Sequence, residues 1–204
     1  MKGIVLELQA SALDESISVE ELLRKAYLVA RKLQLSDFQK WVEDEQNGYK
    51  MSEVPEYRHI RGQYKALNPM GGWIPVMLRP KMEEVASIMP INYPLSQIEN
   101  LYKKNSGTIS FSPNASIQQL LNKNINFPLE TVFIYDSDTS ELYRILSIVR
   151  NKILEGAILL EENGIIGQEL SFTDTEKQIA RKNEGIIQYI NNIYGNVDSA
   201  NFLQ

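Results

Sequence analysis

Residues 18–34 show the apolar spacing of an amphipathic helix, and this stretch constrains the fold more than any other. Apolar side chains recur at intervals of three and four residues, at Val19, Leu22, Leu23, Ala26, Tyr27, Ala30 and Leu33. Ser18 and Glu21 have the spacing of a capping box, and Glu20 and Glu21 each stand one helical turn before a basic residue, Arg24 and Lys25. A helix with one apolar face must bury that face against other elements. The chain is therefore predicted to fold around packed helices.

A second helix is predicted directly after the first. It is predicted to begin after Ser36, which has the capping-box spacing with Gln39, and to end at Gly48. The two helices together form a helical hairpin. Ahead of them, residues 3–13 favour a further helix, although a short strand over residues 4–8 fits the same pattern.

The middle of the chain has the composition of a sheet. Strand-like runs of aromatic and β-branched residues occupy residues 57–67, 73–78, 108–111 and 131–135. The first two runs flank a Gly- and Pro-containing turn and are predicted to form a hairpin. Pro80 begins a short helix that reaches Ile88, and Asn114 can cap another. A small, mostly antiparallel sheet of about four strands is predicted.

Long helices return near the C-terminus. Apolar residues recur at helical spacing from Thr139 onward, at Leu142, Ile145, Leu146, Val149, Ile153, Ala157 and Leu160. Thr173 and Glu176 have the capping-box spacing and begin a helix that is predicted to continue to Gly195. The chain is therefore expected to end in two long helices.

These segments are expected to form a single helix-rich α+β domain, because no internal repeat or linker divides the chain. The predicted parts are a helical region (1–50), a sheet with short helices (55–135), a long helical pair (139–195) and a flexible tail (196–204).

Charge and composition limit the classes of function. With 21 Lys and Arg against 26 Asp and Glu, the net charge of −5 gives no general attraction to nucleic acid or anionic lipid. The absence of cysteine excludes thiolate metal sites and cysteine nucleophiles. Glu7 and Gln9 interrupt the apolar stretch that a signal peptide needs, and no apolar run approaches the ~20 residues that span a bilayer. A cytoplasmic protein without membrane contact is predicted.

No catalytic or metal-binding motif is recognisable in the sequence. The one histidine, His59, lies in a predicted strand without nearby ligands and is interpreted as a half-exposed strand residue. The acidic run Glu43, Asp44 and Glu45 points in different directions around a helix and is interpreted as a solvated face. No metal or cofactor is predicted. A non-enzymatic role is favoured, and the sequence does not decide the question.

A polar and aromatic set around the helical hairpin and the first strand forms the candidate site. Its members are Arg24, Trp41, Glu45, Tyr57, Arg58 and Arg61. Arginines beside an aromatic ring are one way to grip phosphate or stack on a base, although the acidic net charge disfavours nucleic acid. Glu45, when it turns inward beside Trp41, needs a cationic partner such as Arg24 or Arg58. The set is therefore either a binding surface or a structural ion-pair cluster.

The same region resembles a known family. The run LLRKAYLVARKLQLSDFQKWVEDEQNGY, followed by PEYRHIRGQYKALNP and GWIPVML, is similar to the AbiTii family of bacterial abortive-infection proteins. The resemblance is carried by the order Leu22-Leu23-Arg24-Lys25-Ala26, Trp41, Glu45-Gln46-Asn47-Gly48-Tyr49, Tyr57-Arg58 and Arg61-Gly62, with the closing Tyr194-Gly195-Asn196-Val197. It implies a role in antiphage defence, in which the infected cell stops growing or dies before progeny phage mature. It implies no known reaction.

Three functional hypotheses remain open. The leading one is a defence protein whose helical hairpin and adjoining sheet bind a phage or host component. The second is an oligomerisation or partner-binding module of a larger defence system, because the stripe from Leu142 to Leu160 and the isoleucine-rich helix from Ile179 to Ile193 can continue across a two-fold interface. The third is a nuclease or nucleotide-acting toxin, ranked last because no carboxylate pair has metal-site spacing.

Overall fold

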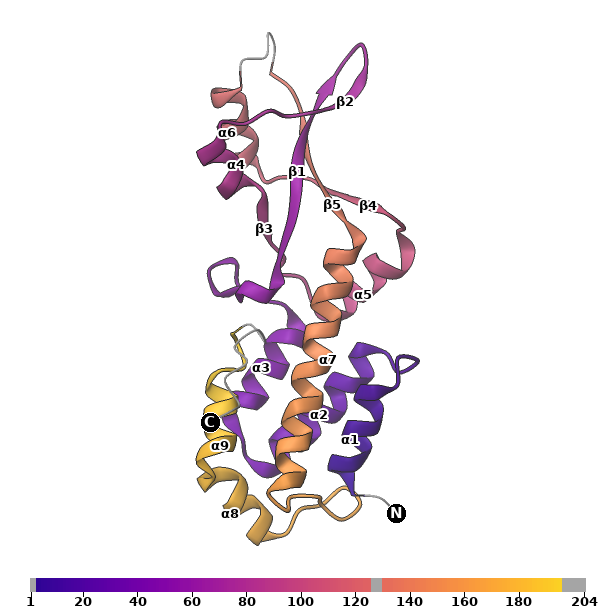
Figure 1. Cartoon of the computed structure of the whole chain (residues 1–204), viewed down its shortest axis with the longest axis vertical. Helices are drawn as coiled ribbons and strands as arrows, with labels where there is room; N and C mark the ends of the chain where they lie inside the picture. The colour runs from indigo at the N-terminus through magenta and orange to yellow at the C-terminus, as the bar shows by residue number, and fades with distance from the viewer. Residues whose placement is uncertain (1–2, 126–129, 196–204) are drawn as a thin grey trace.

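The computed structural model describes residues 3–125 and 130–195, so the predicted tail, 196–204, lies outside the described residues. A group of helices occupies one end of the elongated molecule and a sheet occupies the other (Figure 1). The long helix α7 (Thr139–Glu162) runs from the base of the sheet through the helical end. This arrangement is the helix-rich α+β fold that the sequence predicts.

The helical elements follow the predicted segments closely. Besides α7 they are α1 (Ile4–Leu13), α2 (Val19–Leu33), α3 (Ser36–Asn47), the 3-10 turns η1 (Met51–Glu53) and η2 (Glu56–Arg58), α4 (Pro80–Ala86), α5 (Leu95–Lys104), α6 (Ala115–Asn124), α8 (Asp174–Lys182) and α9 (Glu184–Asn191). The choice left open for residues 3–13 is settled as helix, and the hairpin of α2 and α3 is confirmed.

Local signals set most helix starts but not all. The Ser18 hydroxyl oxygen accepts a hydrogen bond of 3.2 Å from the backbone amide of Glu21. Thr173 and Glu176 form a complete capping box. The predicted box at Ser36 is wrong, because Ser36 is already helical and Leu35 occupies the N-cap position without a side-chain bond. Leu35 is buried. An apolar side chain placed in the core therefore sets this helix start in place of a polar cap.

The strands form an antiparallel sheet in the order β2-β1-β5-β4. They are β1 (His59–Asn68), β2 (Gly72–Pro75), β3 (Ile88–Pro90), β4 (Thr108–Phe111) and β5 (Phe133–Asp138). The extra strand, β3, pairs with the start of β1. The helix predicted to reach Ile88 instead ends at Ala86, because pairing with Arg61 draws Ile88 into the sheet.

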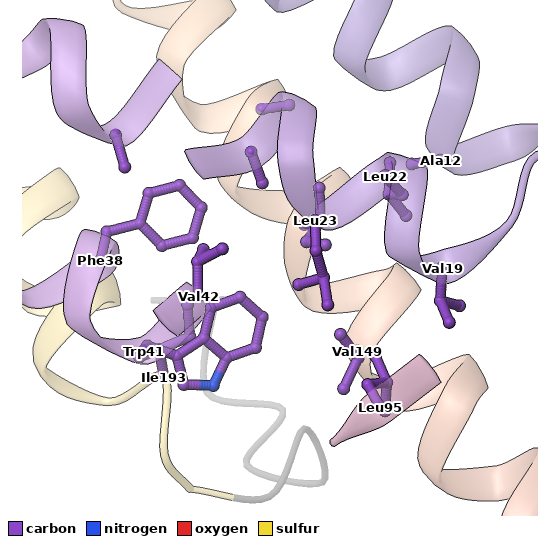
Figure 2. Close-up of a cluster of buried hydrophobic side chains, with 14 of the residues drawn as sticks. Ala12, Val19, Leu22, Leu23, Phe38, Trp41, Val42, Leu95, Val149 and Ile193 are labelled. Atoms are coloured by element: carbon purple, nitrogen blue, oxygen red, sulfur yellow. The ribbon is translucent and has the colours of Figure 1, made fainter. Parts of the chain in front are cut away.

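The main core lies in the helical end and includes the whole predicted stripe of α7. From Leu142 to Leu160 these apolar side chains are buried within the chain, mainly against α1 and α5. Figure 2 shows part of this core, where Leu23, Val149 and Leu95 meet from separate helices. The α7 stripe is thus occupied by intramolecular packing and is not an exposed two-fold surface.

The last predicted helix is bent. One continuous helix was expected from residue 173 to 195, but α8 ends at Lys182 and α9 starts at Glu184. Asn183 between them has an extended backbone, accepts the amide of Ile186 at 3.1 Å and donates to Asn163 Oδ1 at 2.6 Å. These side-chain bonds compete with a continuous helix, as asparagine commonly does.

The sheet is covered on one side only. Leu121 of α6 packs with Ala66 and Phe133 in a second, smaller core, whereas alternate residues of β1, including Arg61 and Gln63, are exposed. Across the helices that the structure describes, none is both long enough and apolar enough to cross a membrane.

Candidate functional site

Trp41, Glu45, Tyr57 and Arg58 of the predicted set meet at the junction between α3 and the first strand. Trp41 and Glu45 lie one turn apart on the inner face of α3. Tyr57 and Arg58 lie in η2, directly before β1. We call these residues, together with Tyr49, the joint cluster. It links the helical end to the sheet.

An ion pair forms the centre of the joint cluster. Arg58 Nη2 donates to Glu45 Oε2 at 2.5 Å and Arg58 Nε donates to Oε1 at 3.2 Å, and both side chains are 0% exposed. The remaining guanidinium nitrogen donates to the carbonyl of Tyr93 at 2.6 Å. The arginine therefore fastens α3 to the segment that precedes α5.

Hydroxyl groups complete the shell around Glu45. Tyr57 and Tyr49 donate to Glu45 Oε1 at 2.6 and 2.7 Å, and Trp41 Nε1 donates to the Tyr57 hydroxyl at 2.9 Å. The guanidinium also lies 4.8 Å from the centre of the Tyr49 ring. In residues 3–125 and 130–195, no buried side-chain nitrogen or oxygen lacks a hydrogen-bond partner.

The electrostatics keep both tyrosines protonated. Burial, and next to it the charge of Glu45, raises the pKa of Tyr49 and of Tyr57 well above 10. Burial opposes the charge of Arg58, but Glu45 outweighs it and raises the pKa of the guanidinium. The cluster therefore holds one stable charge pair with neutral hydroxyl donors.

A buried lysine extends the joint cluster toward the C-terminal helices. Lys152 of α7 lies 5.1 Å from the centre of the Tyr57 ring, and its ammonium donates to the carbonyl of Gly195 at 2.6 Å. Burial lowers the pKa of Lys152. This residue carried no signal in the sequence, because it is a single lysine within the apolar stripe of a long helix.

Arg24 and Arg61 do not join the cluster. Arg24 is exposed on α2 and pairs with Glu20 at 2.5 Å, as its spacing predicts, so the suggested pair with Glu45 is not formed. Arg61 is exposed on β1, where its backbone amide donates to Glu141 Oε2 at 3.2 Å. His59 is half-buried at the start of β1, and its carbonyl accepts a bond from Arg144.

The uncovered side of the sheet forms a second candidate site, which we call the free face. Trp73 of β2 stands directly opposite Leu67 of β1, and a bond of 2.9 Å from the Leu67 amide to the Val132 carbonyl places Val132 on the other side. Directly opposed residues project to the same face. The three side chains are 42%, 37% and 54% exposed. They form an apolar row that crosses β2 and β1 and continues to the residue before β5.

A polar group lies beside this row on the free face. Asp136 of β5 accepts the hydroxyl of Ser110 at 2.6 Å, and Lys65 Nζ lies 2.7 Å from its other oxygen. The side chain of Lys65 is 27% exposed and that of Asp136 9%. Sequence reasoning missed both the row and the polar group, because they depend on strand register.

The two sites differ in what they can do chemically. The charges and hydroxyls of the joint cluster are bonded to one another and its ion pair is fully buried, so the cluster positions elements. Of the cluster, Tyr49 reaches a pocket, which Lys40, Asp44 and Tyr194 also line. The free face is open to a macromolecule and combines an aromatic anchor with polar neighbours. Among the described residues, no group of three or more His, Cys, Asp or Glu is arranged to hold a metal ion.

Comparison with known proteins gives one match. A protein-family model described as AbiTii matches residues 3–185, most of the chain. No curated protein and no solved structure matches the chain.

Proposed function

From the premise that this chain belongs to the AbiTii family of bacterial abortive-infection proteins, we propose that it acts in the cytoplasm by binding a phage or host component through the free face. Membership of the family supports a role in bacterial antiphage defence. The recognition step is the part that we add. It makes the chain a binding protein in that defence.

The observation that carries this proposal is the apolar row of Trp73, Leu67 and Val132. Clustered, exposed apolar side chains on a sheet mark interaction sites more often than scattered ones. Aromatic residues such as Trp73 are the commonest energetic anchors of protein interfaces. Lys65 and Arg61 lie along the same strand and supply a polar rim.

The joint cluster supports recognition by holding the free face in place. It fixes η2, and hence the start of β1, against α3. Arg144 of α7 adds bonds to the carbonyls of Tyr57, at 3.1 Å, and His59. A sheet that is held in place by both α3 and α7 loses little conformational freedom when a partner binds, and this favours affinity.

The test is plaque formation on cells that express the chain at a low level, scored together with survival of the infected cells. The wild-type chain is expected to reduce plaque number while infected cells die. The variant Leu67→Thr/Trp73→Thr/Val132→Thr keeps strand propensity but removes the apolar row. It is expected to restore plaque number to that of cells without the protein.

The matched control is Leu13→Ser, which removes a side chain that is 70% exposed at the end of α1, away from the sheet. It is expected to protect like the wild type. Helix content by circular dichroism must be unchanged in every variant. Full protection by the triple variant would refute the free face as the binding surface. Unchanged plaque numbers with folded wild-type protein, across diverse phages, would refute action by this chain alone.

A further inference from the structure

The bend at Asn183 separates two helices whose sequence favours one. Apolar spacing and the capping box at Thr173 predict a continuous helix to Gly195, yet Asn183 turns the chain and caps α9. The side-chain nitrogen of Asn183 also donates a hydrogen bond to Asn163 Oδ1 at the end of α7. A segment in which local and tertiary preferences disagree can adopt two arrangements.

We propose that α9 exchanges between two copies of this chain. In the exchanged form α8 and α9 straighten into one helix at Asn183, and the α9 of each copy occupies the α9 seat of the other. The α9 seat is the surface of α7 and α3 that α9 and the residues 192–195 after it cover, centred on Lys152, Gly156 and Asp44. This inference is independent of the free face.

The polar contacts of the α9 seat fit this chain's own C-terminal helix. The Tyr189 hydroxyl donates to the carbonyl of Lys152, and its ring lies where a side chain at Gly156 would come within 3.2 Å. Lys152 Nζ reaches the Gly195 carbonyl at 2.6 Å, and the Tyr194 hydroxyl donates to Asp44 Oδ2 at 2.9 Å. A second copy reproduces each of these bonds, which identifies it as the occupant.

Apolar contacts give the same assignment. Ile186, Ile190 and Ile193 are buried by their contact with the rest of the chain, and Ile193 belongs to the cluster that contains Trp41 (Figure 2). Opening α9 without replacing it would expose these side chains and leave the buried Lys152 ammonium without its acceptor. Exchange with an identical helix restores both, so the open chain has a strong preference for a second copy.

Two effects act in opposite directions at the hinge. Straightening adds backbone bonds between the last carbonyls of α8 and the first amides of α9, which otherwise rely on the cap. Asn183 opposes straightening, because it caps α9 and is a poor residue for a helix interior. A surface hollow of about 130 Å³ lies between α9 and the turn that joins α2 to α3.

Two hinge substitutions move the balance in opposite directions. Asn183→Ala removes the cap of α9 and the bond to Asn163 and places a good helix former at the one non-helical residue of the hinge, which favours the straight form by about tenfold per chain. The dimer dissociation constant is therefore expected to fall about 100-fold, since two chains straighten. Glu184→Pro acts oppositely: position 184 starts α9, where Pro is favoured, and Asn183 already has the extended backbone that precedes Pro. This variant is expected to be monomeric.

Light scattering after size exclusion, over a wide concentration range, measures the dissociation constant. Thr175→Ala, on the exposed side of α8, raises helix propensity away from the hinge and is the matched control. Because the chain has no cysteine, Glu155→Cys on α7 of one copy and Gln188→Cys on α9 of another can carry a donor and an acceptor dye. Energy transfer is expected in mixed Asn183→Ala dimers.

Two results would overturn the proposal. One is an Asn183→Ala chain that stays monomeric at hundreds of micromolar with its helices intact by circular dichroism. The other is a dimer that Glu184→Pro leaves unchanged, since such a dimer would use another surface.

Discussion

The joint cluster and the free face each contain a cation paired with a carboxylate, but in different surroundings. Arg58 and Glu45 are 2.5 Å apart with both side chains 0% exposed. Lys65 and Asp136 are 2.7 Å apart with side chains 27% and 9% exposed. The first pair is enclosed by tyrosine hydroxyls and backbone carbonyls, whereas in the second pair Asp136 is buried but Lys65 is partly exposed to water. Similar chemistry therefore holds the architecture together in one region and stays available to a partner in the other.

The difference follows from the cost of leaving one charge alone. Removing a member of a fully buried pair leaves a charge that water cannot reach. When a lysine near the surface is removed, water can take its place beside the carboxylate. The buried pair consequently specifies how α3 meets the sheet. The free-face pair can reorganise when a partner binds.

The largest expected effect comes from breaking the buried pair. Arg58→Met should lower the free energy of unfolding by about 3–5 kcal/mol, because it leaves the Glu45 carboxylate uncompensated. Urea unfolding followed by circular dichroism measures this change. The double variant Glu45→Gln/Arg58→Met should cost clearly less than the sum of the two single variants, since it leaves no isolated charge. A loss below about 1 kcal/mol for Arg58→Met would contradict the enclosed pair.

The next effect concerns the hydroxyl that joins Glu45 to Trp41. Tyr57→Phe removes a donor to the carboxylate and leaves the buried indole N–H without its acceptor. The free energy of unfolding should fall by about 1–3 kcal/mol. Tyr143→Phe, at a tyrosine that is 46% exposed, should leave it nearly unchanged in the same measurement. Equal losses in the two variants would show that the buried hydroxyl has no special role.

Alkaline pH should weaken the joint cluster. Burial and the charge of Glu45 raise the pKa of Tyr49 and Tyr57 above 10 in the folded chain. The unfolded chain loses these protons near pH 10 while the folded chain keeps them, so the free energy of unfolding falls as pH rises further. The slope is about 1.4 kcal/mol per pH unit for each tyrosine. Urea unfolding between about pH 9 and pH 11 should give a shallower slope for Tyr49→Phe; an unchanged slope would assign the pH dependence to other groups.

The smallest effects are expected on exposed surfaces. Lys65→Met should cost about 1 kcal/mol or less, because Ser110 still bonds Asp136 and water reaches the site. Arg24→Ala should cost about 0.5 kcal/mol, the usual value of an exposed helix pair. Thermal unfolding of both variants and of Arg58→Met, measured side by side, gives the order of their losses of stability. A Lys65→Met loss as large as that of Arg58→Met would remove the distinction between the two regions.

The sequence predicted the local parts of the candidate site better than its assembly. Trp41 and Glu45 belong to one helix face, and Tyr57 and Arg58 are adjacent, so their grouping in pairs was accessible from spacing. Tyr49 was not among the predicted site residues, although it stands four residues after Glu45, and this helical spacing was the available signal. The choice between Arg24 and Arg58 as the partner of Glu45 was not accessible, because it depends on how β1 approaches α3.

The sequence by itself determined the features that depend on only one turn of helix or on two neighbouring strands. The apolar stripes of α2 and α7, the caps at Ser18 and Thr173 and the pair of Glu20 with Arg24 are of this kind. Only the tertiary structure decided the burial of Lys152 and the apolar row on the free face. Each depends on residues distant in the chain, and their free energy comes from excluding water, which local spacing does not encode.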